Sequence, residues 1–250
     1  MREDQLLCLY SKECDLESAQ KLVEENNEEA ITQVSSIILD SKNKIMSAML
    51  IKNIALVFTA VFAKYDTISR TLFIEFWKGF EKRDLAQKAI VELFRCHTDE
   101  DTIQFSIVAC YSVILHASYE IYGGDDLIDD LRDAGQSDNI EISTSALRVL
   151  IEIFDSALDA DLYPEQYQKL IETAFITATA VIKKTDLPEI IGYAFKAVGL
   201  VNPEPLLKAG KKTFLMKHLL TLTAKFHEYI INDNQKLILP RRALASTRSG

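Results

Sequence analysis

Glycine and proline are scarce in this chain, which holds eight Gly and five Pro among its 250 residues. Sheets and α/β folds need many special turns, and these two residue types supply the backbone conformations that such turns require. Their scarcity therefore predicts long helices joined by short connections. The hydrophobic fraction of 48% and the charged fraction of 26% are those of an ordinary globular protein, with enough chain for a large core.

Apolar residues recur at helical spacing along most of the sequence. One face of residues 66–80 collects the side chains of Ile68, Leu72, Phe73, Phe76, Trp77 and Phe80. We expect Asp15, Asp66 and Asp84 to cap helices, because a carboxylate accepts the free N–H groups of a first turn. About ten helices are predicted: from Asp15 to about Asn26, Glu28 to about Leu39, Lys44–Lys64, Asp66 to about Phe80, from Asp84, Thr102–Tyr122, Ile140–Leu158, Pro164 to about Lys184, from Pro188, and Lys211 to Ile231. No convincing strand is present.

The segment Thr102–Tyr122 differs from the other predicted helices because it is apolar nearly all round. Phe105 and Val113 lie off its main apolar stripe, which contains Ile107 and Leu115. A helix of this kind is usually central and covered by neighbours on every side.

Helix pairs follow one another at a spacing near forty residues, with units that begin near residues 44 and 84. Stacked helical hairpins of the HEAT or armadillo type show such a spacing. The fold class expected is therefore all-α, either α-solenoid-like or an irregular helical bundle. We expect one helical domain over residues 1–231, with a possible subdivision near an acidic surface loop at 123–139 that contains a short helical turn, and a flexible basic tail over 232–250.

Charge is divided unevenly along the chain, whose formal net charge is −9. Residues 120–165 hold thirteen Asp or Glu against Arg132 and Arg148, a net charge of 2 − 13 = −11. Residues 207–250 hold nine Lys or Arg against Glu228 and Asp233, a net charge of 9 − 2 = +7. Such a division bears on partners and solubility more than on the fold.

The acidic centre contains a pattern of four aspartates, Asp125, Asp126, Asp129 and Asp130. Aspartates four apart share a helix face, and their hard carboxylates suit Mg²⁺. The pattern resembles the DDxxD motif of class I prenyl-diphosphate and terpene synthases, which are also all-helical. That resemblance implies Mg²⁺ bound to a diphosphate substrate. The chain departs from those families because a second metal-binding motif and the Arg pair after the first motif are absent. A solvated acidic loop is the simpler interpretation.

The basic end has several interpretations. Its candidate binding residues are Lys208, Lys211, Lys212, Lys217, Lys225, Arg241 and Arg242, with Arg248 in the same tail. They could contact phosphates or an acidic partner, since such contacts need only positive charge within reach. They could also be ordinary solubility groups. A third interpretation is that the basic end docks against the acidic loop of the same chain, or of another copy, head to tail.

Few other residues suggest chemistry. None of the four Cys lies in a C-x-x-C pair, and no signal peptide opens the sequence, so we expect an intracellular, cytoplasmic protein with free thiols. His116 and His218 lie within apolar helices, where hydrogen-bonded packing is the expected role. The apolar run Met46–Ala63 is interrupted by Lys52, which disfavours a membrane span. No cofactor or metal site is predicted.

These observations favour a non-enzymatic protein–protein interaction module, or scaffold, whose acidic and basic patches select partners of opposite charge. A second hypothesis is an all-helical nucleoprotein that binds nucleic acid through the basic end, although a pI near 5.1 opposes a large phosphate-contacting surface. A third is an enzyme similar to the prenyl-diphosphate synthases.

Overall fold

The computed structural model describes residue 9 and residues 14–40, 46–66, 70–96, 101–156, 158–159 and 161–228. Every regular element in these ranges is a helix, and no strand occurs among them. The all-α fold class is therefore confirmed. The helices are α2 (Leu16–Glu25), α3 (Asn27–Asp40), α4 (Ala48–Asp66), α5 (Arg70–Gly79), α6 (Arg83–Arg95), α7 (Asp101–Tyr119), α8 (Asp125–Gln136), α9 (Ile140–Asp155), α10 (Pro164–Lys184), α11 (Pro188–Gly199) and α12 (Glu204–Lys208). A further helix, called here the C-terminal helix, is described over residues 212–228.

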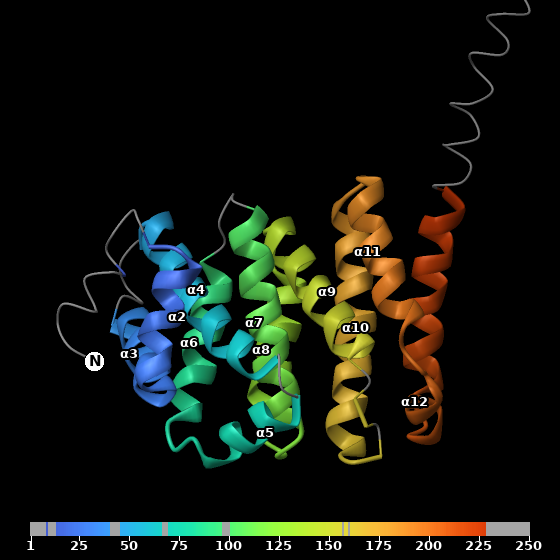
Figure 1. Cartoon of the computed structure of the whole chain (residues 1–250). Helices are drawn as coiled ribbons and strands as arrows, with labels where there is room; N and C mark the ends of the chain where they lie inside the picture. The colour runs from blue at the N-terminus through green and yellow to red at the C-terminus, as the bar shows by residue number, and fades with distance from the viewer. Residues whose placement is uncertain are drawn as a thin grey trace, which may run out of the picture.

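The helices form two layers. In Figure 1 the helices follow one another in chain order from left to right. In one layer α2, α4, α7, α9 and α11 pack successively side by side. In the other layer α3 packs on α6, α6 on α8, and α8 on α10. The C-terminal helix continues this second layer, because its His218 bonds Thr179 of α10, with 2.8 Å between Nδ1 and Oγ1.

Polar contacts between successive helices of one layer join residues at a nearly constant separation. The pairs are Gln104 with Ser145, His116 with Ser156, Arg132 with Thr173, and Thr179 with His218, which lie 41, 40, 41 and 39 residues apart. These separations agree with the spacing near forty residues seen in the sequence. The assignment to a HEAT or an armadillo type stays a prediction.

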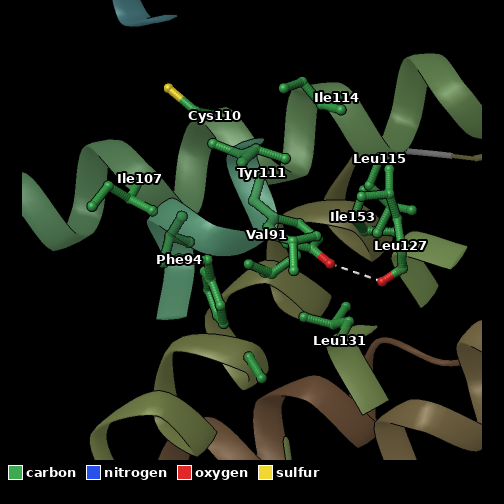
Figure 2. Packing of buried hydrophobic residues seen from close by; sticks show 14 of the residues in the cluster. Val91, Phe94, Ile107, Cys110, Tyr111, Ile114, Leu115, Leu127, Leu131 and Ile153 are labelled. Carbon is green, nitrogen blue, oxygen red and sulfur yellow. Dashed lines mark hydrogen bonds between the residues drawn. The ribbon is translucent and has the colours of Figure 1, made fainter. Parts of the chain in front are cut away.

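The helix α7 lies at the centre of the molecule and packs against α4, α6, α8 and α9. Tyr111 of α7 is fully buried, and its hydroxyl donates to the Leu127 carbonyl of α8 at 2.8 Å, as Figure 2 shows. Its ring also meets that of Phe94 of α6, with 5.1 Å between centroids. One α7 residue departs from the expected burial on every side, because 60% of Phe105 is exposed.

Within the described residues, α7 is also the one helix with the length and hydropathy of a membrane span, and 72% of its apolar window is buried in the protein. The core helix of a soluble protein passes the same test, so this is weak evidence for a span.

Two of the three predicted aspartate caps are wrong. Asp15 does cap α2, and its carboxylate accepts from Ser18 N at 2.8 Å. Asp66 is instead the last residue of α4, and Asp84 lies in the first turn of α6, whose N-cap is Lys82. A carboxylate within the first turn still interacts favourably with the helix dipole, so Asp84 keeps a related role without the cap hydrogen bond. The early prolines Pro164 and Pro188 begin α10 and α11 as expected.

The predicted acidic surface loop at 123–139 is wrong, because residues 125–136 form the regular helix α8. Its inner face buries Leu127, Ile128 and Leu131, whose spacings of one and three residues are helical. The seven polar residues of the same helix obscured this short stripe. The proposed tail at 232–250 lies outside the described residues. A single hydrophobic cluster extends through the described chain from Leu9 to Leu222.

The helices α8 and α10 approach each other closely at Gly135. A Cβ atom at Gly135 would lie 2.1 Å from Oγ1 and 2.6 Å from Cγ2 of Thr177, closer than atoms can pack. We therefore expect Gly135→Ala to lower the free energy of unfolding by about 1–3 kcal/mol, as overpacked cores do.

Gly192 of α11 is the matched control, since a Cβ there has nothing within 4 Å. Gly192→Ala should raise the free energy of unfolding by about 0.5–1 kcal/mol, through helix propensity alone. Urea denaturation of both variants measures the two effects, and equal effects of the same sign would contradict the close approach of α8 and α10.

Candidate functional site

The aspartates of the DDxxD-like pattern lie in the first two turns of α8, but they do not converge on one point. Asp125 faces α10, where its Oδ1 accepts from Lys169 Nζ at 2.5 Å and its Oδ2 from Gln166 Nε2 at 3.0 Å. Asp129 lies 3.8 Å from the same Lys169 nitrogen and 3.6 Å from Arg132. The hydrogen bond from Lys169, followed by that from Gln166, holds the pKa of Asp125 below its ordinary value.

Asp130 points away from α10 toward the other neighbour of α8. Its Oδ1 accepts from Arg95 Nη2 of α6 at 2.8 Å. Partial burial raises the pKa of Asp130, while the Arg95 charge opposes that rise. Asp126 is exposed. Among the described residues, no group of three or more His, Cys, Asp or Glu side chains is placed to hold a metal ion.

Several basic residues singled out in the sequence form ion pairs within the chain. Lys211 bonds Glu172 of α10, Lys225 bonds Asp186 in the connection between α10 and α11, and Lys208 lies 2.9 Å from Glu204. Lys212 and Lys217 are exposed and make no ion pair with a described residue. Arg241 and Arg242 lie outside the described residues.

Three described lysines of the basic end pair with residues outside 123–139, since Lys208, Lys211 and Lys225 pair with Glu204, Glu172 and Asp186. Docking of the basic end on the acidic segment, in the same chain or in another copy, stays a prediction. The end of α8 is held by a different lysine: Lys184 of α10 donates to the carbonyl oxygens of Gln136 and Ser137, the former at 2.9 Å. The sequence analysis did not identify Lys169 and Lys184. Their partners lie 44 and 48 residues earlier in the chain, and no pattern of neighbouring residues indicates such a distant contact.

A pocket of about 360 Å³ opens on the layer that contains α4, α7 and α9. Its walls are mainly apolar, and Phe62 of α4, Phe73 of α5 and Phe105 of α7 contribute aromatic rings. Cys110 also lines it, and burial raises the pKa of this thiol to about 12, so the thiol is neutral at pH 7.

A second pocket of about 520 Å³ adjoins the first. The two share Phe105 and Glu152, so together they form one groove across α4, α7, α9 and α11, called here the Phe105 groove. Arg148 and Tyr193 line the second pocket, with the guanidinium carbon 4.9 Å from the ring centroid and Nη2 3.3 Å from the hydroxyl. This contact orders the wall between α9 and α11.

His116 and Ser156 line the first pocket, with 2.9 Å between Nδ1 and Oγ. Glu120 lies 3.7 Å from His116 Nε2, so the three side chains form a serine–histidine–carboxylate series. A nucleophilic serine must donate its hydroxyl proton to the imidazole. The Ser156 hydroxyl donates instead to the Ile153 carbonyl at 2.6 Å, so its proton is directed away from the imidazole. The arrangement supports hydrogen-bonded packing for His116, as the sequence predicted.

The Phe105 groove was not predicted, although one signal for it was present. Phe105 lies off the main apolar stripe of α7, and an aromatic residue there is either covered by a further helix or left exposed. The sequence cannot decide between these outcomes, since the choice depends on how far apart α4 and α9 lie.

The ion pair between Asp125 and Lys169 can be tested through its pH dependence. We expect Lys169→Gln to lower the free energy of unfolding at pH 7 by about 0.5 kcal/mol, since both side chains are partly exposed. Because the pKa of Asp125 is depressed in the folded state, this stabilisation is present above the unfolded-state pKa near 3.9 and is lost as the pH falls through the lower folded-state value. Wild type and variant should therefore converge once the pH lies below the folded-state pKa of Asp125.

Urea denaturation between pH 2.5 and 7 measures this difference, and Lys88→Gln in the middle of α6 is the control, since Lys88 is exposed. A constant difference at every pH would show that Lys169 stabilises the fold by packing rather than by charge.

Comparison with known protein families, with curated protein sequences and with solved structures found no match to this chain.

Proposed function

We propose that this chain is a non-enzymatic protein–protein interaction module, and that the Phe105 groove is its binding surface. The exposure of Phe105 carries the proposal. It is a large aromatic side chain, 60% exposed, on an otherwise buried central helix, and it stands between two adjoining pockets. Aromatic residues in such positions are enriched among the few side chains that supply most of the energy of an interface.

The groove has the chemistry of a site for a protein segment. Its first pocket is walled by aliphatic and aromatic side chains and holds a few polar groups, among them Ser106 and His116. An apolar floor with isolated polar groups is typical of sites that bury an apolar side chain and hold the adjacent backbone. A partner segment with one or two large apolar residues fits this description.

Charge at the groove is mixed. Asp101 and Glu152 line the second pocket together with Arg148 and Lys196, and Lys196 lies 3.6 Å from Asp155. A rim with both signs favours no strongly charged partner, so we infer that the partner is selected mainly by its apolar residues. The acidic and basic patches expected from the sequence have a smaller part in this proposal, since many of their charges are neutralised within the chain.

The proposal can be tested with a random peptide library selected against the whole protein. Selected peptides should carry large apolar residues, and Phe105→Ala should weaken the binding of each about tenfold or more, because interface hot spots contribute about 2 kcal/mol. Fluorescence anisotropy measures these affinities. Phe105 is exposed, so its replacement should leave the fold intact, which circular dichroism checks.

Leu16→Ala is the matched control, since Leu16 is exposed at the far end of the stack and lines neither pocket. Peptides that bind Phe105→Ala as tightly as the wild type would overturn the assignment of the groove. If the selected peptides are uniformly acidic and bind only at low salt, the basic residues are the binding surface instead of the groove.

A further inference from the structure

The second pocket of the groove is lined by four charged side chains, and two of them have their charge offset within the protein. Lys196 lies 3.6 Å from the Asp155 carboxylate. Asp101 is in the first turn of α7, where the helix dipole favours a negative charge. The two charges that are left are those of Arg148 and Glu152 on α9, and neither forms an ion pair with any residue in the described ranges.

Arg148 and Glu152 do not pair with each other, although they lie four residues apart on one face of α9. A basic residue that precedes an acidic one is the less favourable order for such a pair in a helix. Tyr193 of α11 holds the guanidinium instead, through its ring at 4.9 Å from the guanidinium carbon and its hydroxyl at 3.3 Å from Nη2. The pocket therefore presents a fixed set of N–H donors and, one turn further along α9, a carboxylate that accepts no hydrogen bond from a described residue.

Glu152 stands where the two pockets meet, because it lines both of them together with Phe105. Arg148 lines only the second pocket. A segment whose apolar side chain fills the first pocket would therefore pass Glu152 before it reaches Arg148. The two charges sum to zero, so a neutral group with one donor and one acceptor is complementary to them. The peptide backbone of the segment is such a group.

The conformation of the segment decides whether its backbone is available for these contacts. In an α-helix the N–H and C=O groups bond to one another within the helix. In an extended chain the N–H and C=O of one residue point to the same side, as in the hydrogen-bonded pairs of an antiparallel sheet.

We infer that the Phe105 groove binds its partner as an extended segment, one residue of which donates its N–H to the Glu152 carboxylate and accepts at its C=O from Arg148. The segment and the groove are those of the proposed function, on which this inference rests. Hydrogen bonds to charged groups are the stronger ones, so these two side chains fix the position and the direction of the segment. Its apolar residue supplies the contact with Phe105.

An ester scan tests the extended conformation. Peptides that bind in a Phe105-dependent way, taken from the library selection described above, are synthesised with each backbone amide replaced in turn by an ester. Each ester removes one N–H and weakens the preceding carbonyl as an acceptor. The ester that removes the N–H facing Glu152 should weaken binding about tenfold or more, because that hydrogen bond is to a charged group. The next ester along the peptide should weaken it less, since it only weakens the carbonyl of the same residue. Fluorescence anisotropy with the full chain measures both effects.

Variants of the protein assign each ester to its partner. In Glu152→Ala the first ester should cost nothing further, and in Glu152→Gln, which keeps an uncharged acceptor, its cost should be intermediate. Arg148→Lys keeps the charge without the planar fork and should reduce the cost of the second ester. Glu165→Ala is the matched control and should leave both costs unchanged, because Glu165 is an exposed helical glutamate that lines neither pocket.

Failure of the inference can be told apart from failure of the proposed function. A library that yields no peptide dependent on Phe105 overturns both. Phe105-dependent peptides that tolerate every ester, or that are weakened by esters at several positions three or four apart as a bound helix would be, overturn only the extended conformation. Peptides that share a Lys or Arg, and lose it when selected against Glu152→Gln, show that a side-chain cation occupies the place assigned to the backbone, and also overturn it.

Discussion

The burial of α7 by its neighbouring helices is the constraint on which the rest of this structure depends. Its neighbours α4 and α9 lie in its own layer, and α6 and α8 lie in the other. Because a wholly apolar helix gains stability only where its sides are covered, these four helices must be present and correctly spaced. The hydroxyl of Tyr111 adds a directional requirement, since it is buried and needs the Leu127 carbonyl of α8 as its acceptor. The same spacing leaves Phe105 uncovered, so the groove arises from the packing that buries the rest of α7.

Local sequence patterns predicted most of the helices correctly. The prediction failed where many polar residues surrounded a short apolar stripe. Pro164 and the stripe of α9 marked their helices correctly, because a cap, a proline and a periodic face act within one turn or two. The acidic segment was different, since three buried residues in α8 were outweighed by the aspartates around them. Counting aspartates also overstated the acidic patch. Lys169 pairs with Asp125 and Arg95 with Asp130, and these partners lie 44 and 35 residues apart along the chain.

The candidate site was less predictable than the fold for the same reason. A groove depends on the distance between helices that are not consecutive, and no residue in α7 specifies the spacing of α4 and α9. The sequence also could not show which side of the C-terminal helix packs on α10, because it carries apolar residues on several sides, of which Leu215 and Leu222 are buried and Leu220 is exposed.

The constant separation of polar contacts between neighbouring helices has a consequence for how the chain can be made. The four polar contacts described above each join a residue to one that lies 39 to 41 residues away along the chain. Because synthesis starts at the N-terminus, the pair of helices that a new pair packs against can already be folded when the new pair leaves the ribosome. No contact among these has to wait for the far end of the chain, so the order of translation and the order of assembly can be the same.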